Sequence, residues 1–343
     1  MIHVKATSRP SGTPDYRFDP VPLDIGTRDG YSPNHLGHAL LKWATSPPLR
    51  ALADASGWQW PVCRSTLDLL TRLAELSADW DFRASRERYL IELTPAEANG
   101  RPIPDALVIG ASRALGLVES SAVPDRQFSH LVVLGGQARA CVNRAHHAAR
   151  LVHGGIRAGK VVALGAHRQL GDGEQEQASA VACRHLTDEA EVLLAATRSA
   201  FGLGEPLTSD EPMMPPDPGK PAEFHAASAR YLWPEVEVLI APSELPENRR
   251  AKTGDQLRYW ADLSGIGHEH DVLILTTQIY VPYQHLVATR VLGLERGCAV
   301  HSCGVDAASS LVPVRGFGGR DYLQEIRAAL RAALALLQQA QAA

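Results

Sequence analysis

Residues 130–166 read HLVVLGGQARACVNRAHHAARLVHGGIRAGKVVALGA, and this stretch decides the predicted fold. Two short, almost continuously apolar runs, 130–136 and 160–166, enclose an amphipathic stretch that closes on Gly154 and Gly155. Glycine is a common stop signal at the end of a helix. A strand, a helix and a second strand in this order form a βαβ unit, whose strands are parallel. The stretch therefore predicts a parallel sheet.

The same rhythm recurs on both sides of this unit. Strands that are apolar throughout suit a sheet covered by helices on both faces. We therefore expect an α/β protein with a doubly wound, mostly parallel Rossmann-like sheet. The further strand candidates are 106–111, 235–241, 271–277 and 298–305.

The regions outside the sheet have different patterns. Residues 1–30 lack a hydrophobic period and predict an irregular arm, whereas 31–104 predict an additional helical N-terminal layer. The Rossmann-like domain is expected over 105–320, followed by a C-terminal helix over 321–343. Within the domain, Thr187 is the expected N-cap of one helix, and another is expected to begin at Thr253. Residues 204–222 contain six prolines and predict a mobile excursion or lid.

Composition narrows the class of protein. With 343 residues, 45% of them hydrophobic, the chain can bury a core, and its formal net charge of −4 gives no overall attraction to nucleic acid or an anionic membrane. Five scattered cysteines predict buried thiols and no disulfide framework. A signal peptide and an apolar run long enough for a membrane span are both missing, so we expect a soluble, cytoplasmic protein. The last helix predicts packing on the sheet or, alternatively, a homo-oligomer interface.

The loops after the strands contain the candidate site residues, because ligands of open parallel sheets bind at the carboxyl ends of the strands. Gly135 and Gly136 follow one strand and open a helix, so their N–H groups can approach an anion, with Arg139 or Arg144 adding charge. A tight turn that merely needs glycine is the alternative. After the next strand, His167 and Arg168 offer an imidazole and a guanidinium. A solvated loop is the alternative there.

Two later loops carry polar side chains. Ser243 follows the 235–241 strand, Arg250 makes the loop basic, and Thr253 begins the next helix; a solvated charge run is the alternative. Thr276 and Thr277 end the 271–277 strand. Tyr280 follows and could orient or protonate a substrate, although a packed aromatic residue is the competing interpretation.

Other constellations are incomplete. Cys298, His301 and Cys303 have soft-ligand chemistry but lack a motif that completes a zinc site, so no metal is expected. His146 and His147 are adjacent on a helix and point to different faces. The sequence around Ser112 is not the G-x-S-x-G of a nucleophile elbow.

The order of these segments resembles the YdcF/SanA/ElyC domain family. The segments are LVVLGG (131–136), AARLVHGG (148–155), TDEAEVL (187–193), APSELPENRRAKTGDQ (241–256) and LILTTQIYVPYQHLVATRVLGL (273–294). They fall within residues 128–305, and nothing before 104 is covered. The resemblance implies a Rossmann-like fold, and a member of that family is associated with S-adenosylmethionine. It also implies these site-lining positions: Gly135, Gly136, Glu189, Ser243, Thr253, Thr276 and Thr277.

This chain departs from the family pattern at three positions. Gln256 stands where the family usually has Asn, and Tyr280 and Tyr283 stand where it usually has His and Arg. A mechanism that relies on that imidazole and guanidinium does not transfer to this chain. The tyrosine hydroxyls could instead recognise a ring or a sugar.

The expected function is an enzyme that binds a nucleotide-like or phosphorylated small molecule and catalyses hydrolysis or group transfer. Glu189, His167 and Tyr280 are the candidate catalytic residues. One alternative is an S-adenosylmethionine-binding protein or methyltransferase. The other is a non-catalytic ligand sensor or assembly partner that uses the helical layer and the last helix as interfaces.

Overall fold

The computed structural model describes residues 6–8, 14–27, 31–83, 103–120, 122–171, 173–179, 185–210, 228–243, 250–314 and 316–343, with backbone alone for 6–8 and 14–15. The chain forms two compact units. Unit 1 comprises residues 1–121, 278–290 and 315–343, and unit 2 comprises 122–277 and 291–314. These bounds differ from the boundaries expected at 104 and 321, because the chain returns to unit 1 after the 271–277 strand.

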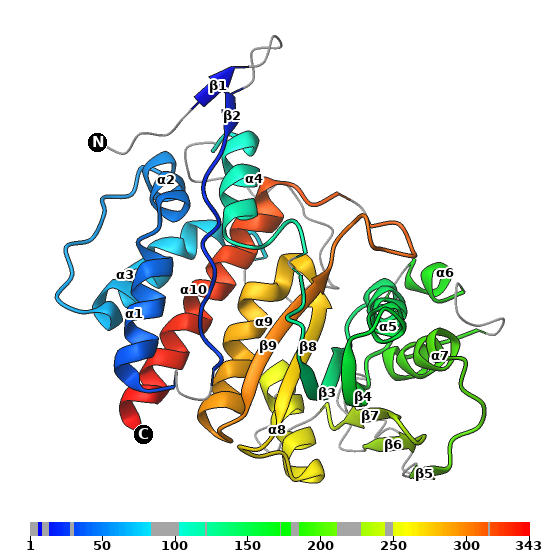
Figure 1. Ribbon diagram of the computed structural model, residues 1–343. Coiled ribbons are helices and arrows are strands. Elements are labelled where there is room, and N and C mark those ends of the chain that lie inside the picture. Colours follow the sequence, from blue (N-terminus) through cyan, green and yellow to red (C-terminus); the bar gives the residue numbers. More distant parts are fainter. Residues whose placement is uncertain are drawn as a thin grey trace. The chain divides into compact units, whose positions relative to one another are not determined.

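Unit 1 is mainly helical (Figure 1). Its last helix, α10 (Gly319–Ala342), packs against several of the others, and its apolar side chains, including Leu323, Ile326 and Leu330, are buried. This helix therefore belongs to the core of unit 1. The other elements are β1 (Ala6–Ser8), β2 (Pro14–Tyr16), α1 (Pro33–Ala44), α2 (Pro47–Ala55), α3 (Thr66–Leu76), η2 (Ser77–Trp80), α4 (Asp105–Ala114), η4 (Gln278–Tyr280) and α9 (Val281–Ala288).

The strand predicted over 106–111 is wrong, because these residues lie within helix α4. Leu107, Val108, Ala111 and Leu115 are buried at helical spacing, and the apolar run is too short for its period to distinguish a strand from a helix. Gly110 fits because a Cβ there would lie only 2.2 Å from the carbonyl oxygen of Tyr16. Residues 1–30 also differ from a wholly irregular arm, since β1 and β2 pair antiparallel.

Unit 2 contains a seven-stranded sheet in the order β5-β6-β7-β4-β3-β8-β9. The strands from β7 to β9 are parallel, and β6 and β5 extend one edge antiparallel. Apart from the one over 106–111, the predicted strands are confirmed. The bounds are β3 (Gln127–Leu134), β4 (Arg157–Ala166), β5 (Thr208–Asp210), β6 (Ala229–Leu232), β7 (Val236–Ala241), β8 (Asp271–Thr277) and β9 (Ala299–Val305).

The parallel strands have the order of a Rossmann-like sheet. Taken in chain order, they lie third, second, first, fourth and fifth across the sheet, so the order reverses between β3 and β8. In such sheets the reversal marks the place where ligands bind, outside the carboxyl ends of the strands. The residues after β3 and at the end of β8 therefore occupy the position to inspect first.

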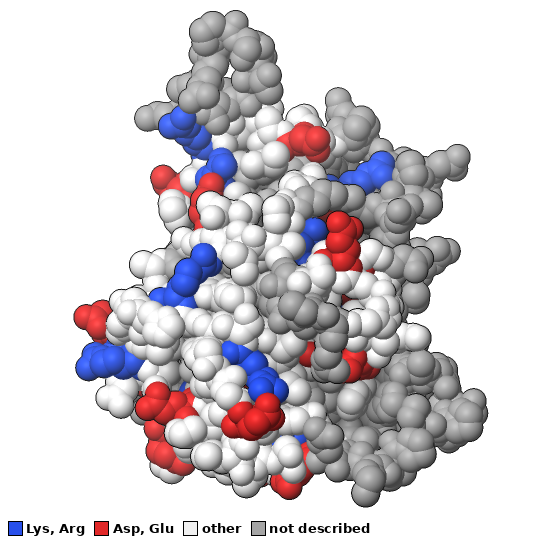
Figure 2. Space-filling view, turned by 90° about the vertical axis from the view of Figure 1, so that its right-hand side faces the viewer, with Lys and Arg blue, Asp and Glu red and all other residues white. Residues whose placement is uncertain are grey.

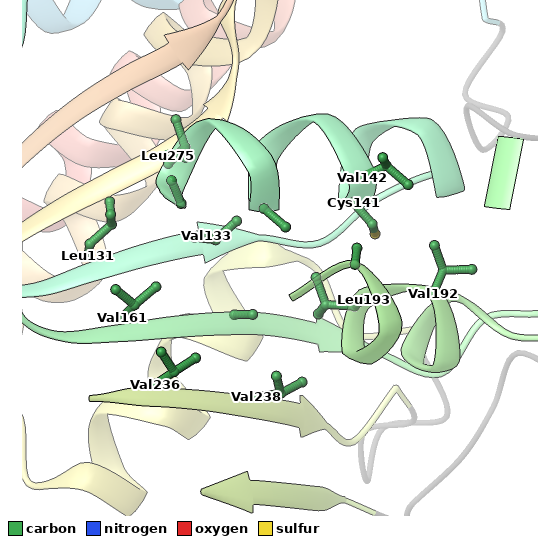
Figure 3. Packing of buried hydrophobic residues seen from close by; sticks show 14 of the residues in the cluster. Leu131, Val133, Cys141, Val142, Val161, Val192, Leu193, Val236, Val238 and Leu275 are labelled. Carbon is green, nitrogen blue, oxygen red and sulfur yellow. The ribbon is translucent and has the colours of Figure 1, made fainter. Parts of the chain in front are cut away.

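Helices cover both faces of this sheet. Helices α5 (Ala138–His153) and α7 (Glu189–Phe201) pack on one face, where Leu131, Val133 and Leu193 join a continuous buried cluster (Figure 3). Helix α8 (Thr253–Ser264) packs against β4 and β7, and its Trp260 contacts His130, whose side chain alternates with that of Leu131. The expected doubly wound α/β fold is thus present. Unit 2 also contains α6 (Glu174–Ala178), and η5 (Thr289–Leu294) spans the change of unit.

Of the two predicted helix starts, the one at Thr187 needs a correction and the one at Thr253 is confirmed. Asp188, and not Thr187, is the N-cap of α7, because its backbone is extended and its carboxylate accepts the N–H of Ala190 at 2.7 Å. Lys252 is the N-cap of α8, with Thr253 as the first helical residue. The predicted excursion over 204–222 includes strand β5. Its residues 211–222 lie outside the described residues, as do residues 84–102 of the predicted N-terminal layer.

Candidate functional site

The turn after β3 places Gly135 against the neighbouring strand. Its N–H donates to the carbonyl of Leu164 at 2.7 Å. A Cβ on Gly135 would lie 3.0 Å from both Glu189 Oε1 and Gly165 Cα. Glycine is therefore needed here for close packing of backbone and carboxylate. The glycine pair predicted to open a helix at a strand end does so, since α5 begins two residues after Gly136.

Arg144 on α5 is buried and binds the ends of the two strands at the reversal. Its Nη1 donates to the carbonyls of Leu134 (2.7 Å) and Gly135 (2.5 Å). Its Nε and Nη2 donate to Thr277 Oγ1, both at 3.1 Å. Gly136 passes close by, because a Cβ there would lie 3.3 Å from Nη1. A guanidinium charge thus lies where ligands of this fold class bind.

Arg168, just after β4, lies between two carboxylates. Its Nε donates to Glu189 Oε2 at 2.7 Å, while Nη1 and Nη2 donate to the two oxygens of Glu174 at 2.8 and 2.9 Å. Only 3% of the Arg168 side chain is exposed. Although burial opposes its charge, the hydrogen bonds to Glu174 and the charge of Glu189 raise the pKa of Arg168. Its buried guanidinium therefore holds the carboxylates of Glu174 and Glu189 in place.

Glu189, the first residue of α7, turns one oxygen toward Arg168 and the other toward the glycine turn. Among the described residues no donor reaches Oε1, which lies near Gly135 and Gly165. Burial raises the pKa of Glu189 above its usual range, although the charges of Arg168 and Arg250 act in the opposite direction. The carboxyl is thus suited to hold a proton.

Glu174 was not among the predicted site residues. Its Oε1 accepts the N–H of Ala138, the first residue of α5, at 2.8 Å, and its Oε2 accepts the N–H of Gly171 at 2.7 Å. Burial alone would raise the pKa of Glu174, but hydrogen bonds from Arg168, Gly171 and Ala138 keep it below its usual range. An acidic residue in the loop after a predicted strand was the only sequence signal for it.

His167 and Arg139 are the remaining candidates near the ends of β3 and β4, and they lie in different surroundings. His167 Nδ1 lies 3.3 Å from Asp188, the N-cap of α7, so the imidazole is oriented by a carboxylate next to Glu189. Arg139 is half-buried in the first turn of α5. His167 therefore lies in the loop beside Glu189, and Arg139 lies in the helical turn that follows the glycine turn.

The loop after β7 contributes Ser243, Arg250 and Thr253. Ser243 is buried, and its carbonyl accepts the N–H of Ala251 at 2.8 Å. The positive charge of Arg250 acts on Glu189, which brings this loop into the electrostatic environment of the site. Thr253 is half-buried at the start of α8.

The predicted residues at and beyond the end of β8 belong to different compact units, Thr276 and Thr277 to unit 2 and Tyr280 to unit 1. Thr277 accepts from Arg144, whereas Thr276 is fully buried and its Oγ1 has no hydrogen-bond partner among the described residues. Tyr280 belongs to unit 1, where its ring lies edge-on to Phe317, 6.5 Å between centroids. Its assignment to the site stays a prediction.

Comparison with known proteins finds similarity to one domain family and to two uncharacterized proteins. Residues 27–116 match the model of the Rv3785 N-terminal domain. The chain is 29% identical over 324 residues to the uncharacterized protein Rv3785 of Mycobacterium tuberculosis and to the uncharacterized protein Mb3814 of Mycobacterium bovis. In each case the similarity covers 88% of this chain and 89% of the relative. No solved structure matches the chain.

This similarity extends well beyond the matched domain. Residues 27–116 fall in unit 1, whereas the glycine turn, Arg168 and Glu189 fall in unit 2. The match to the Rv3785 N-terminal domain therefore bears on the helices of unit 1 and carries no information on the chemistry of the site.

The described part of the chain contains no group of three or more His, Cys, Asp or Glu side chains able to hold a metal ion. Burial raises the pKa of Cys141 and of Cys303 to about 12, so both thiols are unreactive at neutral pH. None of the described helices is long and apolar enough to cross a membrane. On the face shown in Figure 2, acidic and basic side chains are interspersed.

Proposed function

We propose that the protein is an enzyme that binds a nucleotide-like or phosphorylated small molecule at the carboxyl ends of β3, β4, β7 and β8, and that it catalyses hydrolysis or group transfer. The observation that carries the proposal is the buried guanidinium of Arg144 at the reversal of strand order, beside the glycine turn that opens α5.

The anionic part of the ligand is assigned to the start of α5. Among the described residues, the N–H groups of Gly136, Gln137 and Arg139 donate to no acceptor. N–H groups at the start of a 16-residue helix attract negative charge, and Gly136 lets a ligand approach the backbone closely. Arg144 and Arg139 add positive charge to the same turn. A phosphoryl group fits this combination of donors.

The polar but uncharged part of the ligand is assigned to Glu189. Its Oε1 faces the glycine turn and accepts no hydrogen bond from a described residue, so it can accept one from a ligand hydroxyl. A carboxyl beside an anion site is typical of proteins that hold the ribose of a nucleotide. Phosphate recognition and hydroxyl recognition within one loop cluster favour a nucleotide-like ligand or a sugar phosphate.

The resemblance to the YdcF/SanA/ElyC family supports the same assignment. Of the positions that it implies, Gly135 and Glu189 lie in contact, and Gly136 and Thr277 both lie against Arg144. Catalysis in such a site relies on positioning and electrostatic stabilisation of the reacting group. Glu189 supplies the proton-transferring group, and His167 is the second candidate.

A thermal-shift screen with nucleotides, sugar phosphates, S-adenosylmethionine and inorganic phosphate tests the proposal. A ligand at 100 times its dissociation constant stabilises the folded protein by about 2.7 kcal/mol. We expect a shift with phosphorylated compounds that inorganic phosphate reduces by competition. A shift with S-adenosylmethionine alone would favour the methyltransferase alternative. No shift with any compound would contradict the proposal and favour the assembly partner.

Turnover of the compound that binds then tests the catalytic part. Glu189→Gln should abolish turnover and retain binding of the phosphorylated group, because the amide keeps the shape of the side chain but cannot transfer a proton. Glu176→Gln, on the exposed side of α6, is the matched control and should leave turnover unchanged. Unchanged turnover in Glu189→Gln would contradict the role of Glu189.

A further inference from the structure

The two carboxylates on Arg168 are held unequally. Glu174 receives two hydrogen bonds from the guanidinium, one on each oxygen, whereas Glu189 receives one, from Nε. Glu174 also accepts the N–H groups of Ala138 and Gly171. Four donors thus converge on Glu174, and a single described donor reaches Glu189.

This inequality separates the proton affinities of the two groups. Hydrogen bonds to the charged form favour an ionised carboxyl, and burial with few donors favours a protonated one. The pKa of Glu174 is accordingly lowered by its donors, while burial raises that of Glu189. Two neighbouring carboxyls whose environments shift their pKa values in opposite directions are the usual arrangement of a proton-transfer site.

The segment that carries Glu174 is short and is anchored at two positions, Glu174 and Ala178, of which Ala178 belongs to the buried cluster of unit 2. Helix α6 has five residues, of which only Glu174 and Ala178 are buried. Its inward-facing position next to Gly171 is thus occupied by a carboxylate whose described partners are Arg168 and two backbone N–H groups. An apolar residue there would anchor the segment as well but would leave Arg168 to Glu189.

We propose that Glu174 is a positioning residue: it binds Arg168 with both oxygens and thereby leaves Glu189 as the carboxyl that takes up and releases a proton at this edge of the sheet. This inference rests on the proposed function. When the bond between the transferred group and the leaving oxygen breaks, Glu189 gives its proton to that oxygen. When water or an acceptor hydroxyl then bonds to the transferred group, its proton passes to the Glu189 carboxylate, which restores the starting state.

Carboxyl ¹³C NMR titration of the full chain tests this inference without a ligand, with Glu189→Gln used to assign the Glu189 signal. In the unchanged protein, Glu189 should titrate above the usual value for a glutamate, about 4.3, and Glu174 below it. In Glu174→Gln, the guanidinium of Arg168 is no longer shared with a second carboxylate and interacts more strongly with Glu189, which lowers the pKa of Glu189. The loss of the nearby negative charge of Glu174 lowers this pKa further. The Glu189 midpoint should therefore fall by about one pH unit or more. Glu176→Gln on the same helix should not move it.

The inference would be overturned if Glu189 titrated at or below the usual value for a glutamate, or if its midpoint were unchanged in Glu174→Gln. If Glu174→Gln does not fold, the order of titration in the unchanged protein decides, and Glu174 titrating above Glu189 would overturn it. If a phosphorylated ligand binds but the Glu189 midpoint is unchanged in Glu174→Gln, this inference fails and the proposed function stands. If Glu189 and Glu174 titrate as expected but no ligand binds, the proposed function is contradicted instead.

Discussion

Arg144 donates from Nε and from Nη2 to the hydroxyl oxygen of Thr277, both over 3.1 Å. This contact joins α5 to the end of β8, and Nη1 of the same guanidinium holds the end of β3. The two strands that it joins are those between which the strand order reverses. The candidate site is thus built around a side chain that also holds the carboxyl ends of these two strands together.

Replacing Thr277 by Val should destabilise the protein by about 1–3 kcal/mol, because two buried guanidinium N–H groups lose this acceptor. Thr276→Val is the matched control, since it makes the same change in the adjacent residue. The Thr276 hydroxyl is buried and has no partner among the described residues, so its loss should be neutral or slightly stabilising. Urea unfolding of both variants measures the difference. Equal losses would show that the Arg144 contact contributes nothing.

Replacing Gly135 by Ala should weaken ligand binding and reduce stability by about 1–3 kcal/mol, because the added methyl would lie 3.0 Å from Glu189 Oε1 and from Gly165 Cα. Either the turn or the carboxyl must then move. Gly204→Ala is the control, because a Cβ there meets nothing within 4 Å and its φ is not in the left-handed region. Thermal unfolding with and without ligand measures both effects. Unaltered binding by Gly135→Ala would show that the turn is not part of the site.

The parallel sheet could be predicted from sequence because its strands are apolar throughout and are punctuated by glycine. The runs at 130–136 and 271–277 form the two strands on either side of the reversal. The loops after these strands must meet at the carboxyl ends of the sheet, which is why the sequence predicts Gly136 and Thr277 in one site. The contact between Arg144 and Thr277 depends on the tertiary structure.

Other features depend on contacts that no local pattern contains. The run at 106–111 forms a helix because it packs within unit 1, where Gly110 approaches the backbone of Tyr16. Glu174 lies in a short polar segment, and only the tertiary structure brings it to Arg168 and Ala138. Likewise, Tyr280 follows β8 directly in sequence but belongs to the other compact unit.

The stability of the protein should fall as pH is lowered from about 6.5 toward 4, partly because of His130. Burial, with the charges of His270 and Lys160 acting in the same direction and that of Glu237 opposing them, lowers its pKa to about 4. An unfolded histidine titrates near 6.5, so the unfolded chain binds this proton first and acid favours unfolding. The slope from this group is at most about 1.4 kcal/mol per pH unit, because the unfolded and folded states differ by no more than one bound proton at this side chain.

Urea unfolding between pH 7 and pH 4 measures this dependence. His130→Gln should reduce the slope because it removes the group that the unfolded state protonates. His268→Gln removes a histidine whose side chain is 88% exposed and should leave the slope unchanged. A slope that is the same in His130→Gln and in the unchanged protein would contradict the assignment.

An amide NMR titration with inorganic phosphate, and then with the phosphorylated compound that stabilises the protein most, tests the central claim most directly, because it locates the ligand on the chain. The account predicts that the largest shifts occur at the amides of Gly136, Gln137 and Arg139, with smaller ones at residues beside Glu189. Arg157→Gln, at the opposite end of β4, should bind equally well. Shifts confined to other parts of the chain, or none at saturating ligand, would contradict a binding site at the reversal of strand order.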